Sequence, residues 1–365
     1  MRVGVPRERK DGERRVGLLP EGVAVLVASG HVVLVERGAG ERVGFDDSAY
    51  ARAGADIVAD GAEIFGCALI VKVKELQRSE WPMLQPGTVV FAFAQFGRDR
   101  ELLAAALGAG IGCIAYETVA AHDGTLPLLA PMSRIAGRLA PLIAASLLMS
   151  DRGGSGVLLP GLDGVPAGRV VIVGAGNVGG EAARVAAGMG CSVRVFGRSA
   201  PRLAVLRKRC AGDVEVAGND PAMLASAIAG ADVVIGAVLQ PGKLSPKLVT
   251  REMVRAMRGG SVLIDVGIDQ GGIAHTSRMT SLSDPTYVEE GVTHYCVPNM
   301  PALVARTATL ALTCATLPYV RALADQGIDA ALAADAGLRA GLQIRAGAVT
   351  HAGLAADCDL PLARA

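Results

Sequence analysis

The stretch RVVIVGAGNVGGEAARVAAGMGCSVRVFGRS, residues 169–199, decides the fold. Residues 169–173 form a short, apolar, β-branched run that glycines follow at once, and this pattern predicts a fully buried strand. The alanine-rich segment 181–189 predicts a helix, and 192–196 predicts a second strand. Strand, glycine turn, helix and strand in this order indicate a dinucleotide-binding unit, with an incidental glycine-rich turn as the alternative.

The glycine turn has the spacing G-x-G-x-x-G. In that pattern the first glycine permits a tight turn, the second lets a pyrophosphate lie against the backbone, and the third lets the helix pack close to its strand. The N-terminus of the following helix offers unpaired N–H groups and partial positive charge to a diphosphate. The residues predicted to hold the diphosphate are Gly174, Gly176, Asn177, Val178 and Gly179.

The end of the second strand distinguishes the two nicotinamide dinucleotides. An Asp or Glu at this place usually accepts hydrogen bonds from the ribose 2′-OH of NAD. This chain has Gly197 instead, which cannot repel a 2′-phosphate, followed by Arg198 and Ser199, with Arg202 close behind. A guanidinium suits a 2′-phosphate, so the sequence favours NADP(H) over NAD(H). The alternative is that Arg198 is a solvated loop residue and the pocket tolerates both.

Composition narrows the class of protein. A length of 365 residues favours two domains, and a net charge of +1 gives no reason to expect a nucleic-acid or membrane partner. The seven cysteines show no C-x-x-C and no metal-ligand spacing, so we expect reduced core thiols and no metal. The start of the chain lacks the apolar core of a signal peptide, and the apolar run 139–149 is too short to span a bilayer. We expect a cytoplasmic protein.

A second alternation of strands and helices runs from residue 2 to residue 116. It predicts another parallel sheet, in which ligand-facing residues lie past the C-terminal strand ends. Lys74 and Gln95 follow two predicted strands, and Arg15 lies in a loop after another. The predicted fold is α/β, with two Rossmann-like doubly wound parallel-sheet domains joined by long helices and an active-site cleft between them. We assign residues 1–130 plus 307–365 to a substrate domain and 131–306 to the dinucleotide domain.

Motifs along nearly the whole length carry a family resemblance. They are GVPRE near Val5, ERRVGLLP (13–20), KVKE (72–75), AYETV (115–119), LPLLAPMS-IAGRLA (126–140, with Arg134 in the gap), GAGNVGG, IGAVLQPG, IDQGG (268–272) and YCVPNMPALVARTAT (295–309). The chain resembles the alanine dehydrogenases and, more distantly, the hydride-transfer subunit of nicotinamide nucleotide transhydrogenase.

The resemblance implies roles for individual residues. It implies that Arg15 and Lys74 hold the substrate carboxylate, and that Asp269 positions ammonia or the attacking water. The simpler alternatives are a solvated loop arginine, a strand-end surface lysine and a helix-capping aspartate. We also assign Gln95 and Asn299 to the substrate, and Asp269, Gln95 and Lys74 to catalysis. Further positions assigned to the cofactor are Ser133, Val238, Leu239, Ile268, Asp269, Asn299 and Met300.

Gln95 departs from the family pattern, because the family has a catalytic histidine there. A histidine exchanges protons near neutral pH, whereas glutamine can hydrogen-bond a substrate but cannot titrate. Loss of a general acid typically costs about 10²–10⁴-fold in rate, but an already protonated imine would suffer much less. None of the five histidines lies at the matching position, and His122 is the one remote substitute. Other departures are Arg134, Gln240, Ala305 and Ala308.

Three functions follow. The first hypothesis is an NADP(H)-dependent amino-acid dehydrogenase or imine reductase that transfers a hydride between the nicotinamide and the α-carbon of a small 2-amino or 2-imino acid. The alternative is ordinary alanine dehydrogenation, which converts L-alanine, NAD and water to pyruvate, ammonia and NADH. The third is a non-catalytic dinucleotide-binding sensor, which the retention of Arg15, Lys74 and Asp269 disfavours. We expect a small carboxylate-bearing amino, oxo or imino acid as substrate, and a homo-oligomer, either dimer or hexamer.

Overall fold

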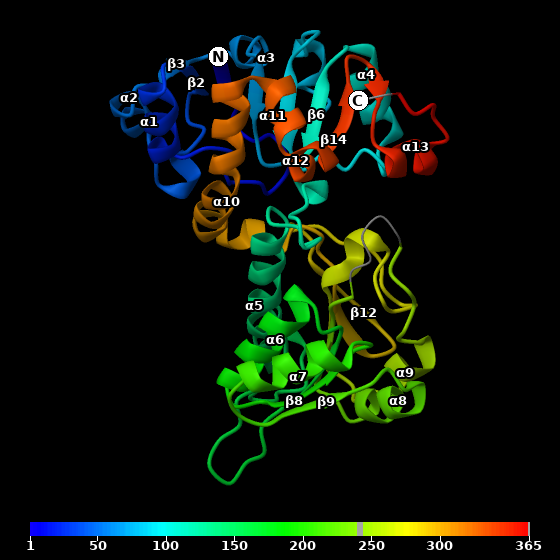
Figure 1. Cartoon of the computed structure of the whole chain (residues 1–365). Coiled ribbons are helices and arrows are strands. Elements are labelled where there is room, and N and C mark those ends of the chain that lie inside the picture. Colours follow the sequence, from blue (N-terminus) through cyan, green and yellow to red (C-terminus); the bar gives the residue numbers. More distant parts are fainter. Residues whose placement is uncertain (239–243, 364–365) are drawn as a thin grey trace. The chain divides into compact units, whose positions relative to one another are not determined.

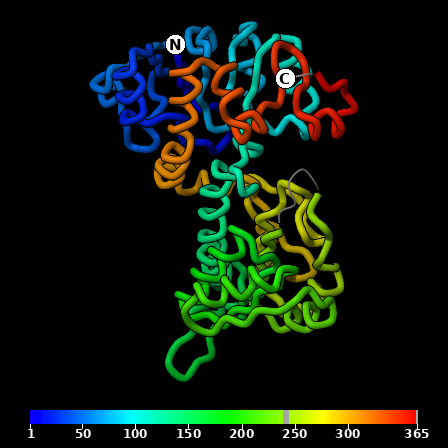
Figure 2. The backbone as a smooth tube through the Cα atoms, viewed as in Figure 1, coloured from blue at the N-terminus to red at the C-terminus, as the bar shows by residue number. Residues whose placement is uncertain are grey.

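The computed structural model describes residues 1–238 and 244–363, which form two compact units. Unit 1 contains Met1–Met132 and the chain from Ala302 onward, and unit 2 contains Ser133–Pro301. The chain therefore passes from unit 1 to unit 2 once and returns once, which can be followed along the tube in Figure 2. Each unit is built around one sheet with helices packed against it (Figure 1).

The sheet of unit 2 has the strand order β12-β13-β11-β10-β7-β8-β9. All neighbouring pairs are parallel except β12 with β13 at one edge. The order reverses between β7 and β10, and a reversal of this kind marks where doubly wound sheets bind ligands, beyond the C-terminal strand ends. The strands are β7 (Arg169–Val173), β8 (Ser192–Phe196), β9 (Val214–Ala217), β10 (Val233–Gly236), β11 (Val262–Asp265), β12 (Thr286–Glu289) and β13 (Val292–Tyr295).

The central strand β7 is buried on both faces, which explains its unbroken apolar sequence. Val170 and Ile172 pack in one core cluster with residues of α5 and α6, and Val171 and Val173 pack in the other with residues of α8. The helices are α5 (Ala130–Leu147), α6 (Asn177–Gly188), α7 (Ala200–Arg209), α8 (Pro221–Ala229) and α9 (Arg251–Arg255).

The six parallel strands of unit 1 repeat the order of the six parallel strands of unit 2. Its sheet reads β15-β14-β6-β5-β4-β1-β2-β3, with parallel pairing from β6 to β3 and antiparallel pairing of β14 and β15 at the other edge. Here the order reverses between β1 and β4. The strands are β1 (Arg2–Val5), β2 (Val32–Glu36), β3 (Asp56–Val58), β4 (Leu69–Val71), β5 (Val89–Ala92), β6 (Gly112–Ala115), β14 (Leu342–Arg345) and β15 (Ala348–Val349).

Aspartates begin several helices of unit 1 by accepting a backbone N–H of the first turn, as Asp99 does for α4. The segment Met300–Gln326, which includes α10, has a mean hydropathy of 1.3 and is long and apolar enough to span a membrane, yet half of its apolar window is buried in the fold. Core helices of this kind pass the same test. The helices are α1 (Pro20–Ala28), α2 (Asp47–Arg52), α3 (Gly61–Phe65), α4 (Arg100–Gly108), α10 (Ala305–Gln326), α11 (Ile328–Ala334), α12 (Ala336–Ala340) and α13 (Ala352–Cys358).

The predicted α/β class with two doubly wound sheets is confirmed. The local differences are small and have physical causes. The fingerprint helix α6 begins at Asn177 rather than at Glu181, because Val178, Gly179 and Gly180 already belong to its first turn. Both sheets also end in antiparallel strands that the expectation of purely parallel sheets left out.

Candidate functional site

The three glycines of the turn after β7 meet different surroundings. A Cβ at Gly174 would lie 2.4 Å from the carbonyl oxygen of Ala237, and Gly174 has a left-handed φ of 117°. A Cβ at Gly179 would lie 1.8 Å from the carbonyl oxygen of Gly174. At Gly176 a Cβ would meet nothing within 4 Å. The first and third glycines are therefore required by packing within the protein, whereas the second leaves room for a ligand.

The start of α6 fits a diphosphate. Gly176 is its N-cap and makes no side-chain cap hydrogen bond to the N–H groups of the first turn. Helix α5 approaches this point closely, since a Cβ at Gly137 would lie 2.3 Å from the carbonyl oxygen of Val178. Ser133 lies four residues before Gly137 and shares its helix face. The turn and Ser133 therefore suit the dinucleotide that the sequence predicts.

The residues after β8 also take defined places. Gly197 is buried, Arg198 and Arg202 are exposed, and Ser199 is the N-cap of α7. The hydroxyl oxygen of Ser199 accepts the Arg202 N–H at 3.5 Å, so this oxygen is engaged in capping. A Cβ at Gly197 would lie 3.1 Å from that of Ala175 in the glycine turn. An acidic side chain at Gly197 would be crowded, and the exposed Arg198 follows it directly.

Asp269 lies half-buried inside a 3-10 helix, Val266–Gln270, that follows β11. The N-cap of this helix is Asp265, so Asp269 does not cap it. Asp265 is buried, and its Oδ2 accepts the N–H of Ile273 at 2.7 Å and the hydroxyl of Ser277 at 2.5 Å. Burial raises the pKa of Asp265 despite these hydrogen bonds. Asp265 thus ties down the loop that carries Asp269.

The remaining predicted cofactor residues of unit 2 also follow strand ends. Val238 comes after β10, and its carbonyl oxygen accepts the hydroxyl of Ser245 at 3.2 Å. Ile268, Asn299 and Met300 are buried. Leu239 and Gln240 lie outside the described residues.

Arg15 of unit 1 is buried and bound by an acid. Its Nη2 and Nε donate to Glu13 at 2.6 and 2.8 Å, and its Nη1 lies 3.1 Å from the sulfur of Met132. Glu13 also accepts the backbone N–H groups of Arg14 and Arg15. With 2% of its surface exposed, Arg15 is not the solvated loop residue that the simpler interpretation expects.

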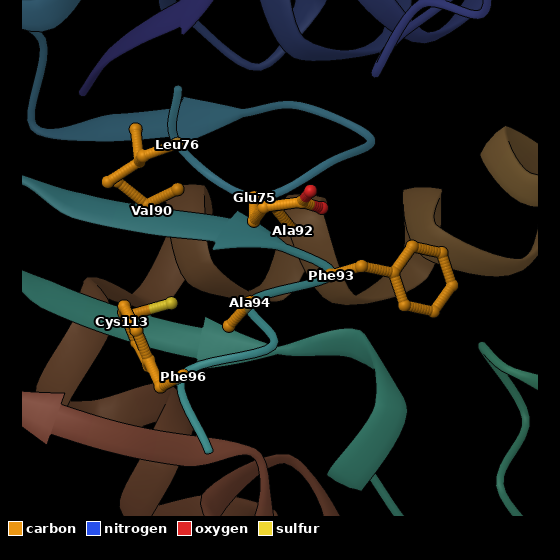
Figure 3. Close-up of a pocket in the computed structure, with 8 residues that line it drawn as sticks. All are labelled: Glu75, Leu76, Val90, Ala92, Phe93, Ala94, Phe96 and Cys113. Atoms are coloured by element: carbon orange, nitrogen blue, oxygen red, sulfur yellow. The ribbon is translucent and has the colours of Figure 1, made fainter. Parts of the chain in front are cut away.

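Lys74 follows β4 and is likewise buried. Its Nζ lies 3.8 Å from Glu75 Oε2 and 5.8 Å from the centre of the Phe93 ring. Lys10 also pairs with Glu75, and although burial opposes it, the two lysines hold the Glu75 pKa below its usual value. Under this loop lies a cavity of about 10 Å³ (Figure 3), room for one water, with walls formed by Glu75, Leu76, Val90, Ala92, Phe93, Ala94, Phe96 and Cys113.

A second set of buried charges supports the Lys74 loop. Glu8 Oε1 accepts the N–H of Val73 at 2.6 Å, and Glu8 Oε2 accepts that of Lys74 at 3.4 Å. Lys72 Nζ lies 3.0 Å from Glu80 and 3.5 Å from Glu8. Burial raises the pKa of Glu8 to about 7, although Lys72 acts in the opposite direction. The main chain on both sides of Val73 is therefore fixed by a buried carboxylate.

Gln95 follows β5 in a left-handed backbone conformation, φ 53°, which non-glycine residues adopt infrequently. Glu117, after β6, accepts the N–H groups of Ala94 and Gln95 at 3.1 and 3.0 Å. Burial raises the pKa of Glu117 in spite of these hydrogen bonds. His122, the remote substitute, lies exposed on a turn.

Glu8, Glu13 and Glu117 lie in motifs of the family resemblance, but the sequence predicted no role for them. Their side chains hold the backbone or the guanidinium of the predicted site residues Lys74, Arg15 and Gln95. The available signal was an acidic residue close to a predicted buried strand, as in GVPRE and AYETV. A buried acidic residue needs a partner. Among the described residues, no group of three or more His, Cys, Asp or Glu side chains could hold a metal ion.

Comparisons with known proteins cover both units. The family model "Alanine dehydrogenase/PNT, N-terminal domain" matches residues 4–136, and "Alanine dehydrogenase/PNT, C-terminal domain" matches residues 140–352. The chain is 48% identical over 336 residues to an alanine dehydrogenase of Halomonas elongata, covering 92% of this chain and 91% of that protein. It is 44% identical to alanine dehydrogenase 2 of Staphylococcus aureus strain USA300, covering 97% and 96%.

Solved structures give the same grouping. A structure of an L-alanine dehydrogenase matches with a TM-score of 0.95 and 43% identity, covering 98% of this chain and 99% of that one. A transhydrogenase from Sinorhizobium meliloti matches with a TM-score of 0.81 and 26% identity, covering 96% and 99%.

Proposed function

Because this chain belongs to the alanine dehydrogenase/PNT family, we propose that it is a nicotinamide-dependent alanine dehydrogenase. It would convert L-alanine, oxidised cofactor and water to pyruvate, ammonia and reduced cofactor. The observation that carries the proposal is the pair of buried cations, Arg15 and Lys74, in the segments that follow β1 and β4. These strands are neighbours at the point where the order of the unit 1 sheet reverses.

In this proposal unit 1 binds the substrate and unit 2 binds the dinucleotide. Arg15 and Lys74 hold the alanine carboxylate through charge-assisted hydrogen bonds. Glu13 keeps the Arg15 guanidinium in one orientation by binding two of its nitrogens. Gln95 donates an amide N–H to the amine-derived or carbonyl group of the substrate, and Asn299 contributes a further polar group.

The dinucleotide, when bound, supplies a nicotinamide ring that accepts the hydride from the alanine α-carbon. Hydride loss from alanine whose ammonium has given a proton to solvent leaves an iminium. Asp269 accepts a proton from the water that attacks this iminium and returns it to the amino nitrogen, so that ammonia leaves as the hydroxyl proton passes to solvent and the carbonyl of pyruvate forms. Because Gln95 cannot transfer a proton, proton transfer falls to Asp269 and water. Asp265 maintains the Asp269 loop for this purpose.

The preference for NADP(H) over NAD(H) is the finer part of the proposal. It rests on Gly197 in place of an acid and on the exposed guanidinium of Arg198. Ser199 and Arg202 border the same strand end. The diphosphate would lie at Gly176, where no Cβ fills the space.

The comparisons favour ordinary alanine dehydrogenation over the imine reduction that the sequence put first, since the similar proteins bear the name alanine dehydrogenase. Imine reduction remains the second candidate because of one observation. Gln95 cannot titrate, and an already protonated imine does not need a proton donor during hydride transfer. We also keep a cytoplasmic homo-oligomer, dimer or hexamer, as part of the proposal.

A direct assay tests the proposed function. The purified chain is incubated with L-alanine and either NAD or NADP, and pyruvate, ammonia and reduced cofactor are measured together. We expect all three in equal amounts, with the larger kcat/KM for NADP. Reduction of a preformed cyclic imino acid without any turnover of alanine or pyruvate would favour the second candidate. Tight dinucleotide binding without turnover of any of these compounds would indicate a sensor.

A further inference from the structure

Glu8 shares its cation with a second acid. Lys72, which is fully buried, lies 3.0 Å from Glu80 Oε2 but 3.5 Å from Glu8 Oε2. Glu80 also accepts the N–H of Gln77 at 2.7 Å. Lys72 is therefore closer to Glu80 than to Glu8. Of the two buried carboxylates, Glu8 has the negative charge that Lys72 neutralises less.

The two cations proposed to bind substrate already have acidic partners. Arg15 is paired with Glu13 at 2.6 Å, and Lys74 lies 3.8 Å from Glu75. These pairs and the Lys72 cluster leave no surplus of positive charge among the described buried groups at this end of the sheet. A substrate carboxylate that binds Arg15 and Lys74 therefore adds a negative charge to a buried region that is already balanced or acidic, which is costly at low dielectric.

We propose that Glu8 accepts a proton from solvent when a carboxylate substrate binds to unit 1, and that the charge of Glu8 thereby sets the affinity for that carboxylate. The inference rests on the proposed function, because it takes the ligand of Arg15 and Lys74 to be an anion. Glu8 acts through the Lys74 loop and does not itself touch the substrate.

The hydrogen bonds of Glu8 let it change its charge while it continues to hold the segment that carries Lys74. Its Oε1 holds the short hydrogen bond from Val73, and an oxygen that accepts this N–H can do so in the ionised or the neutral acid. The incoming proton goes to Oε2, which makes the longer contacts, 3.4 Å to the Lys74 N–H and 3.5 Å to Lys72. The position of Lys74 is preserved while one negative charge is removed.

The groups that face Glu8 support this assignment. The Glu8 pKa is raised to about 7 overall, because burial, Glu13 and Glu80 raise it more than Lys72 and the hydrogen bond from the Val73 N–H lower it. The neighbouring Tyr116 is held in its neutral form, because burial and the Glu8 charge both raise the pKa of its hydroxyl. Glu8 is therefore about half protonated near neutral pH. At this point a new charge nearby changes its protonated fraction most.

Another acid that could take the proton is Glu117, whose pKa burial also raises. Glu117 accepts the N–H groups of Ala94 and Gln95, and it lies on the opposite side of β5 from the Lys72 cluster in the strand order. Glu75 is not a competitor, because Lys74 and Lys10 keep it ionised. The experiment must therefore distinguish proton uptake by Glu8 from proton uptake by Glu117.

The test is titration calorimetry of the full chain, saturated with reduced cofactor, with oxamate as a non-reacting analogue of a 2-oxo acid. Repeating each titration at pH 7 in buffers of different ionisation enthalpy gives the number of protons taken up. We expect wild type to take up roughly a few tenths of a proton per oxamate. Its oxamate affinity should rise about three- to tenfold from pH 8 to pH 6.

Glu8→Gln keeps an oxygen for the Val73 N–H and has no charge to lose, so we expect no proton uptake and a nearly flat affinity across this range. Glu117→Gln should retain both effects. Glu80→Gln should move the affinity change to lower pH, because it removes an acid that raises the Glu8 pKa and leaves Lys72 to Glu8 alone. This shift would not arise from a merely structural role of Glu8.

The outcomes distinguish a failure of the proposed function from a failure of the Glu8 proposal. Oxamate binding that Arg15→Met and Lys74→Met do not weaken, or no binding at all, would overturn the proposed function and this inference with it. Binding that needs Arg15 and Lys74, with proton uptake unchanged in Glu8→Gln or abolished only in Glu117→Gln, would overturn this inference alone. If Glu8→Gln does not fold, the Glu80→Gln shift carries the test, and its absence contradicts the proposal.

Discussion

The carboxylate of Glu117 accepts the backbone N–H of Gln95 at 3.0 Å and so fixes a residue whose φ of 53° lies in the left-handed region. Strain of this kind persists only where the surroundings hold it, and it gathers at functional sites. The residue held in this way is Gln95, at which we predict, from the family resemblance, that glutamine replaces a catalytic histidine.

Substituting Gln95→His should restore a titrating group at this position. We expect kcat for the reductive amination of pyruvate to rise by about tenfold or more, because general acid–base catalysis typically contributes about 10²–10⁴-fold. Gln95→Asn is the matched control, since asparagine also tolerates positive φ but cannot titrate. Equal rates for both variants would show that position 95 does not limit proton transfer.

Substituting Arg198→Asp should reverse the cofactor preference. We expect NADPH affinity to fall by about 10- to 100-fold relative to NADH, because a charge-assisted contact to the 2′-phosphate is lost and repulsion replaces it. Arg207→Asp, an exposed position in the last turn of α7, makes the same change of charge away from the strand end. An unchanged NADPH-to-NADH ratio in Arg198→Asp would remove the basis for NADP(H).

Substituting Arg15→Met should raise KM for pyruvate by about 10- to 100-fold, as expected when a charge-assisted hydrogen bond of about 1.5–3 kcal/mol is removed. The neighbouring Arg14 is exposed, so Arg14→Met is the matched control and should leave KM within about twofold. A similar KM in both variants would mean that Arg15 serves only its ion pair with Glu13. Urea denaturation of each variant separates this result from unfolding.

The buried Glu8 predicts a dependence of stability on pH. Its pKa is raised from 4.5 in the unfolded chain to about 7 in the folded one, so the folded state binds the extra proton between these values. The free energy of unfolding contributed by Glu8 is therefore highest below pH 4.5 and declines as pH rises to 7, by up to about 3 kcal/mol. Relative to wild type, Glu8→Gln should gain stability between pH 5 and pH 8 in urea denaturation. A difference that does not change with pH would contradict the raised pKa.

The sequence predicted well what local patterns determine. The run Arg169–Val173 and the glycine spacing after it specify β7 and the turn, because a strand buried on both faces must be apolar and the turn has no room for a Cβ at Gly174 or Gly179. The places of Lys74 and Gln95 past strand ends were predicted for the same reason, since each directly follows a run of buried residues.

The roles that could not be predicted from the sequence depend on contacts between segments that are far apart in the chain. Glu8 meets Val73 across 65 positions, and Glu117 meets Gln95 across 22, and both contacts arise only because β1 pairs with β4 and β5 with β6. No periodicity within a single segment encodes these pairings. The same limit applies to Glu13, which lies only two residues from Arg15 but whose role depends on both side chains being buried together.

The most direct test of the central claim follows the hydride itself. The chain is incubated with L-alanine deuterated at the α-carbon and with oxidised cofactor, and the reduced cofactor is analysed by mass spectrometry. We predict one deuterium in the nicotinamide ring, together with pyruvate and ammonia, and loss of this product in Lys74→Met. Reduced cofactor without deuterium, or no reduced cofactor while the dinucleotide is bound, would contradict the assignment of this chain as an alanine dehydrogenase.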